Sequence, residues 1–111
     1  MRRLIAGLAA SAVALSVVTV DVVDAKASRK SVVRPYNAKL NRIASCESGR
    51  RWHVATGNGF FGGLQFTVGT WRSVGGRGMP HWHSALEQKY RAVKVFKRRG
   101  SWGDWPVCGF R

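Results

Sequence analysis

The sequence predicts a small α+β domain of two or three helices, a short β-hairpin and one disulfide bond. Three observations predict this class. The chain has 111 residues, of which 45 % are hydrophobic, and this is the size and composition of a single globular domain. Two segments carry apolar residues at helical spacing, and an Asn-Gly pair lies between them. The chain also has two cysteines. Its length excludes a two-domain dinucleotide-binding fold, a long solenoid and a multi-pass membrane protein.

The first 27 residues have the pattern of a secretory signal peptide. Arg2 and Arg3 precede an uncharged, mostly apolar run over residues 4–20, and Ala25-Lys26-Ala27 offers a small-residue cleavage site. We therefore expect residues 1–27 to be removed from a protein that is secreted, either extracellular or associated with the cell wall. An uncleaved membrane anchor is the alternative.

Cys46 and Cys108 are the two cysteines. In a small exported domain an even count indicates a disulfide. This bond would close a loop of roughly 60 residues and contribute about 4 kcal/mol to stability. A metal-binding pair is the alternative, which the wide separation makes the weaker interpretation.

The first helix places a carboxylate on its apolar stripe. Asn37 is a candidate N-cap for a helix over residues 38–48, and Gly49 is its expected end. Its apolar positions are Leu40, Ile43 and Ala44, and Glu47 occupies the next position of the same series. Burial there would raise the pKa of this carboxyl and suit it to proton donation. The alternative is a glutamate that faces solvent at a fraying helix end.

Residues 28–34 are basic and poor in large side chains, so we interpret them as a flexible linker before a domain at 35–111. In the middle of that domain Asn58-Gly59 favours a type I′ turn and hence a hairpin. The pair Gly62-Gly63 indicates close approach of another segment. Thr67 or Thr70 is the candidate cap of a brief helix that follows.

The longest helix is expected over residues 84–99, and Gly100 ends it. Ser84 and Glu87 have the spacing of a capping box. The apolar stripe of this helix consists of Leu86, Tyr90, Val93 and Phe96.

Between Cys46 and Cys108 the chain carries an ordered set of motifs. They are Cys46-Glu47-Ser48-Gly49, Trp52, Thr-Gly-Asn-Gly-Phe-Phe-Gly-Gly-Leu-Gln-Phe over 56–66, Thr70-Trp71, Gly75-Gly76, Trp102-Gly103 and Trp105-Pro106-Val107-Cys108. In content and order, these motifs resemble the catalytic domain of the resuscitation-promoting factors, the secreted muralytic proteins of actinobacteria. The resemblance implies a lysozyme-like fold, bridged cysteines and Glu47 as the single catalytic acid. It also implies cleavage of the β-1,4 bond between N-acetylmuramic acid and N-acetylglucosamine in peptidoglycan. The glycan-binding positions that we expect are Gln65, Thr70, Thr56, Asn58 and Trp71.

Two departures from the family pattern affect substrate contacts. The family's Gly-Gly-Asn-Trp is Gly49-Arg50-Arg51-Trp52 in this chain, which places two cations near the expected cleft. Ser101 is inserted in the closing Gly-Trp-Gly. Neither departure removes the acid.

A second catalytic carboxylate is the open mechanistic question, because glycosidases usually use two. The candidates are Glu87, which the capping box already explains, and Asp104, for which an ion pair in the loop is the simpler interpretation. We therefore favour a single-acid mechanism. It leads either to hydrolysis or to a 1,6-anhydro product, and the sequence does not decide between them.

We expect no cofactor and no metal site, because three histidines without a matching thiolate or carboxylate make a poor ligand set. The formal net charge of +14 predicts attraction to anionic cell-wall polymers in addition to peptidoglycan glycan strands. Export argues against nucleic acid as the physiological partner, and we expect a monomer. The alternative function is a basic, non-catalytic cell-wall-binding module.

Overall fold

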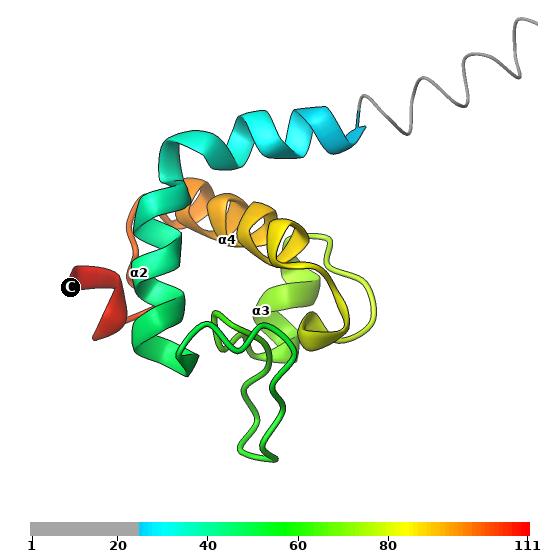
Figure 1. Ribbon diagram of the computed structural model, residues 1–111, viewed down its shortest axis with the longest axis vertical. Helices are drawn as coiled ribbons and strands as arrows, with labels where there is room; N and C mark the ends of the chain where they lie inside the picture. Colours follow the sequence, from blue (N-terminus) through cyan, green and yellow to red (C-terminus); the bar gives the residue numbers. More distant parts are fainter. Residues whose placement is uncertain (1–24) are drawn as a thin grey trace, which may run out of the picture.

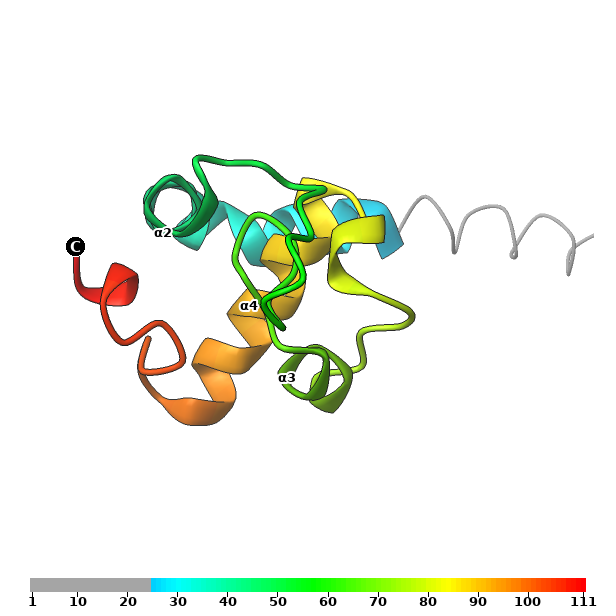
Figure 2. The same cartoon turned by 90° about the horizontal axis from the view of Figure 1, so that it is seen from below.

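The computed structural model describes residues 25–111, so the apolar run of the expected signal peptide lies outside the described residues. The helices and 3-10 turns (η) follow in the order η1 (Arg34–Tyr36), α2 (Asn37–Ser48), α3 (Val68–Ser73), η2 (Pro80–Trp82), α4 (Ala85–Arg99) and η3 (Cys108–Phe110). In Figures 1 and 2 the C-terminal segment lies beside α2, and α3 lies across the molecule from both. Over residues 25–111, no helix has the length and apolar character that crossing a membrane requires.

The segment before α2 is helical and is held against the domain. Residues 25–33 form helical turns that continue through η1 into α2. Val33 is buried in the core, and the Nε of Arg29 donates a 2.6 Å hydrogen bond to Oε1 of Glu87. In the structure residues 28–33 are thus helical, where the sequence indicates a flexible linker over 28–34.

Helix α2 has the expected buried stripe and the expected end. Leu40, Ile43 and Ala44 are fully buried, and Gly49 ends the helix with a φ of 67°, in the left-handed region that favours glycine. The expected cap at Asn37 is wrong, because the helical backbone runs in from η1 and leaves no side-chain cap. Asn37 Oδ1 instead accepts a 2.8 Å hydrogen bond from Nζ of Lys89 on α4.

The expected hairpin is not confirmed, since the part of the chain described by the structure contains two isolated antiparallel bridges but no strand. These bridges join Ala55 to Phe61 and Phe61 to Phe66. A type I′ turn needs positive φ at both central residues, but Asn58 is not among the residues with positive φ. Residues 55–66 therefore form a glycine-rich loop that folds back on itself.

Helix α4 begins and ends where the sequence predicts. The Oγ of Ser84 accepts the backbone N–H of Glu87 at 3.1 Å, and Gly100 closes the helix with a φ of 77°. The buried face differs from the expected stripe, because it consists of Gln88, Ala92, Val93 and Val95, whereas Leu86, Tyr90 and Phe96 are only half-buried.

A buried glutamine on α4 organises the middle of the chain. The Oε1 of Gln88 accepts the N–H of Gly63 at 3.0 Å, and its Nε2 donates to the carbonyls of Trp52 at 2.8 Å and His83 at 2.9 Å. A Cβ on Gly62 would collide with the same side chain. This contact explains the close approach that the glycine pair predicts.

We expect Gln88→Met to destabilise the fold by about 3 kcal/mol, because it keeps the volume but leaves three backbone groups without partners, one buried and two part-buried. Urea unfolding monitored by tryptophan fluorescence measures this change. Lys97→Met, at an exposed position of the same helix, serves as the control and should stay within about 0.5 kcal/mol of the parent. Equal stability of the two variants would contradict the role given to Gln88.

Candidate active site

Two adjoining hollows form a groove between the end of α2, the glycine-rich loop and the C-terminal segment. The first, of about 300 Å³, includes Glu47 and is lined on its far side by residues 105–108. The second, of about 50 Å³, extends to Thr67 and Thr70 on α3. The two hollows share Phe60, Gln65, Asp104 and Trp105. The groove therefore runs from the carboxyl of Glu47 to the first turn of α3.

Glu47 lies on the last turn of α2, where the buried stripe reaches the surface. Its side chain is half-buried at the groove, and this burial raises the pKa of its carboxyl above the usual range. A carboxyl of this kind holds its proton to a higher pH than an exposed one, and can then donate it to a group bound in the groove.

Ser48 fixes the end of α2 to the glycine-rich loop. Its hydroxyl, which is buried, donates to the carbonyl of Gly63 at 2.8 Å and accepts the N–H of Arg51 at 3.0 Å. No role for Ser48 was predicted from the sequence. The only sequence features that indicated such a role were the position of Ser48 next to the candidate acid and the close approach predicted at the glycine pair.

Gln65 lines both hollows of the groove and has an unusual backbone conformation. Its φ is 53°, a left-handed conformation that few residues other than glycine adopt. Its Nε2 donates to the carbonyl of Gly62 at 2.9 Å, which fixes the amide. A strained backbone that is held by its surroundings occurs often at functional sites.

The floor of the groove is Trp105, which a hydrogen bond to the glycine-rich loop keeps in place. Its ring is 3 % exposed, and its Nε1 donates to the carbonyl of Leu64 at 2.8 Å. Three residues further on, Cys108 is bonded to Cys46, with 5.7 Å between the two Cα atoms. The predicted disulfide is thus confirmed, and it places the C-terminal segment beside Glu47.

Thr67, and not Thr70, caps α3. The Oγ1 of Thr67 accepts the N–H of Thr70 at 3.2 Å and donates to the Oγ1 of Thr70 at 3.0 Å. The hydroxyl hydrogen of Thr70 is therefore available to a molecule in the second hollow.

Three of the predicted glycan-binding residues lie elsewhere. Trp71 is fully buried, and its Nε1 donates to the carbonyl of Arg77 at 3.2 Å, so it is a core residue and has no face open to a sugar. Thr56 and Asn58 lie on the exposed loop and line neither hollow. Of the aromatic side chains that line the groove, Phe60 is the exposed one, at 44 %, and its role was not predicted from the sequence.

The other two side-chain carboxylates of the described residues are both ion-paired. Asp104 lines the groove, but its Oδ1 is 2.5 Å from the Nε of Arg99. Glu87 bridges Arg29 and Arg91, at 2.6 Å and 2.8 Å. Burial opposes ionisation of Glu87, but the hydrogen bonds and charges of the two arginines outweigh it and lower its pKa.

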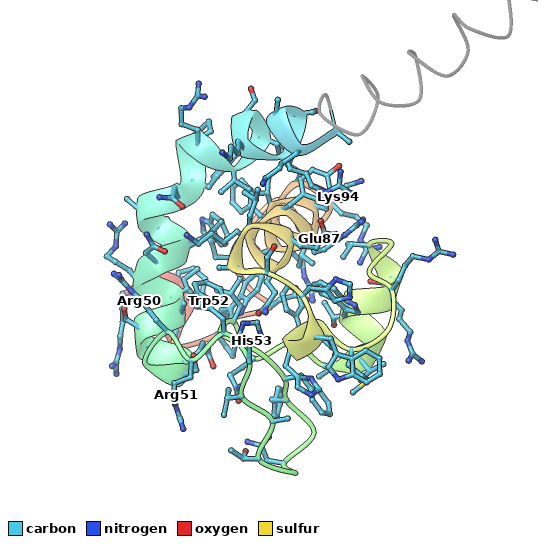
Figure 3. The ribbon with its side chains drawn as sticks, turned by 45° about the vertical axis from the view of Figure 1, so that its right-hand side comes forward. Arg50, Arg51, Trp52, His53, Glu87 and Lys94 are labelled. Carbon is cyan, nitrogen blue, oxygen red and sulfur yellow. A yellow bond between two sulfur atoms is a disulfide. The ribbon has the colours of Figure 1, made fainter. Side chains whose placement is uncertain are left out.

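The two arginines that depart from the family pattern project from the end of α2 (Figure 3). The Nε of Arg50 donates to the Oγ of Ser45, and the Nε of Arg51 donates to the carbonyl of Ser48, both at 2.8 Å. Neither arginine lines the groove. Among the described residues, no group of three potential metal ligands is brought together.

A family model described as a transglycosylase-like domain matches residues 34–108. The chain is 48 % identical over 68 residues to the resuscitation-promoting factor Rpf of Micrococcus luteus, a match that covers 61 % of this chain and 30 % of that protein. It is 47 % identical over 76 residues to RpfE of Mycobacterium tuberculosis, covering 68 % and 44 %. It is 41 % identical over 70 residues to Rpf1 of Corynebacterium glutamicum, covering 61 % and 36 %. The match thus spans less than half the length of each of these relatives.

Proposed function

Because the chain belongs to the transglycosylase-like domain family, and its fold is the small lysozyme-like domain of the resuscitation-promoting factors, we propose that it cleaves peptidoglycan. The bond is the β-1,4 linkage from N-acetylmuramic acid to N-acetylglucosamine. The observation that carries this proposal is the half-buried Glu47, whose pKa is raised, in a groove open to solvent. Its substrate lies in the cell wall, so the protein acts outside the membrane, and the names of its relatives, the resuscitation-promoting factors, support a role in exit from dormancy.

Glu47 is the single acid and base of the proposed reaction. Its carboxyl gives a proton to the glycosidic oxygen while the bond from that oxygen to the muramyl C1 breaks. The oxygen of the muramyl 2-acetamido group attacks C1 and forms a bond to it. The Glu47 carboxylate then takes a proton from the sugar's 6-hydroxyl, or from water, as that oxygen attacks C1 and displaces the acetamido oxygen. The 6-hydroxyl gives an anhydro product and water gives hydrolysis.

The other residues of the groove position the glycan. Gln65 and Thr70 present an amide and a hydroxyl for the acetamido and hydroxyl groups of the sugars, and Phe60 offers an aromatic face. Asp104, neutralised by Arg99, has no role as nucleophile in this scheme.

Digestion of purified peptidoglycan, followed by mass spectrometry of the products, tests the proposal. Muropeptides with anhydromuramyl ends, lighter by one water than hydrolysed ends, would identify a lytic transglycosylase, and reducing ends would identify a hydrolase. A wall that is bound but left intact would refute the enzyme and support the alternative of a basic binding module.

We expect Thr70→Val to lower kcat/KM for peptidoglycan by about tenfold, since it removes one hydrogen bond to the glycan and keeps the shape. Thr56→Val removes the same hydroxyl from the exposed loop and should change kcat/KM by less than about twofold. Rates of muropeptide release compare the two. An equal loss in both variants would contradict the placement of the glycan in the groove.

A further inference from the structure

A second concave site lies between the end of α3 and the face of α4, apart from the Glu47 groove. Its volume is about 640 Å³, and none of its lining residues lines that groove. It is lined by Ser73, Val74, Gly75, Arg91, Lys94, Lys97 and Arg98. In Figure 3, Lys94 projects from α4 well away from Arg50 and Arg51 at the end of α2.

Four cations meet in this site because of their spacing on α4. Arg91, Lys94 and Arg98 lie three and four residues apart, and Lys97 follows Lys94 by three, so all four share one side of the helix. Arg91 is paired with Glu87. Within residues 25–111, no carboxylate lies within ion-pair distance of Lys94, Lys97 or Arg98. The site therefore presents a net positive charge to solvent.

The two arginines are fixed by the end of α3. The Nη1 of Arg98 donates to the carbonyl of Ser73 at 3.0 Å, and its Nη2 donates to the Oγ of Ser73 at 2.8 Å. The Nη1 of Arg91 donates to the carbonyl of Val74 at 2.8 Å, while its Nε is bonded to Glu87. Each arginine therefore has two of its guanidinium nitrogens bonded within the protein, and these bonds hold it at the site. The remaining guanidinium N–H groups and the two lysine ammonium groups are cationic donors that can bind phosphate oxygens, lysine as a point charge.

We propose that this site binds a phosphodiester-linked polymer of the cell wall. Arg91 and Arg98 are seven residues apart, or about 10 Å along the helix, so a strand of repeating phosphates can meet several cations at once. The lining has no aromatic side chain, whereas sites for single-stranded nucleic acids combine cations with stacking aromatics. The choice of a wall polymer rests on the proposed function. Binding would keep the enzyme on its substrate without a contribution from the catalytic groove.

The test compares two matched double variants of the protein. Lys94→Glu/Lys97→Glu reverses two charges in the site, and Lys39→Glu/Arg42→Glu reverses two charges with the same spacing on α2. Affinity for purified poly(glycerol phosphate) is measured by calorimetry across salt concentrations, with circular dichroism to verify folding. We expect the α4 variant to bind at least about tenfold more weakly and the α2 variant to lose less than about threefold. For the parent, we expect log Kd to rise with log salt with a slope of about 3.

Equal losses in the two variants would show attraction to overall charge and would overturn the site. Equal or tighter binding of polygalacturonate, a carboxylate polymer, would overturn the assignment to phosphate. Tighter binding of oligo(dT) would overturn the assignment to a wall polymer. Binding needs no catalysis, so a parent protein that binds the polymer but leaves peptidoglycan intact would refute the proposed function and leave this site standing.

Discussion

Replacing Glu47 with glutamine is expected to lower the rate of peptidoglycan cleavage by about 10³-fold. The amide has nearly the same shape as the carboxyl but cannot give a proton to the glycosidic oxygen or take one from the attacking group. The proposed mechanism uses this one residue in both steps, so no other group compensates. The rate is measured by the release of muropeptides from purified peptidoglycan, with binding to the same material measured separately and expected to persist.

Two other carboxylates provide the controls for this prediction. Glu87→Gln lies outside the groove and should leave the rate of cleavage within about twofold, at a temperature where the variant is folded. Asp104→Asn changes a residue of the groove wall and should lower the rate by less than about tenfold, because this residue does not transfer a proton in the proposed scheme. A loss at Asp104 as large as that at Glu47 would refute the single-acid mechanism.

The raised pKa of Glu47 predicts how the rate of cleavage depends on pH, which is a second test of its role as the acid. The first step needs the protonated acid, so kcat/KM should fall as the pH rises through this raised pKa.

The raised pKa of Glu47 also affects stability. This pKa is higher in the folded than in the unfolded chain, so ionisation of the carboxyl favours unfolding. Stability should therefore decline as pH rises from the unfolded value through the folded one. We expect Glu47→Gln to be at least as stable as the parent at neutral pH, in a thermal melt monitored by circular dichroism.

Local chemistry allowed much of the helical frame to be predicted from the sequence. Gly49 and Gly100 end their helices because each adopts the left-handed backbone that favours glycine. The stripe of α2 has helical spacing, and it leads directly to Glu47. The resemblance to the resuscitation-promoting factors is confirmed, because it depends on a long ordered set of motifs and not on any single one.

Features that depend on distant partners were missed. Ser48 and Gln88 are polar, so hydrophobic periodicity does not predict that they are buried. Both are nevertheless buried, and both form hydrogen bonds with the backbone of the glycine-rich loop. The helix at residues 25–33 is held by contacts such as that from Arg29 to Glu87, which is 58 residues further along the chain. Phe60 faces solvent and Trp71 is buried, and this difference likewise depends on the packing of the whole core.

Loss of the Cys46–Cys108 bond is expected to destabilise the fold by about 4 kcal/mol, because the bond closes a loop between residues 62 apart and restricts the unfolded chain. Small domains have total stabilities of about 5–15 kcal/mol, so this is a large share. The change is measured by urea unfolding of Cys46→Ser/Cys108→Ser against the oxidised parent. Dithiothreitol should shift the parent toward the variant and leave the variant unchanged.

The same bond also shapes the groove, so its loss should impair cleavage even where the chain stays folded. Cys46 precedes Glu47, and Cys108 ends the segment that forms the far wall. Without the bond, the hydrogen bond from Trp105 to Leu64 still fixes the floor, but residues 106–108 lose their covalent link to α2. We expect cleavage by the double variant to fall by about tenfold or more in conditions where circular dichroism shows it folded. Full activity of the folded, unbridged protein would show that the C-terminal segment is a structural support and takes no part in holding the glycan beside Glu47.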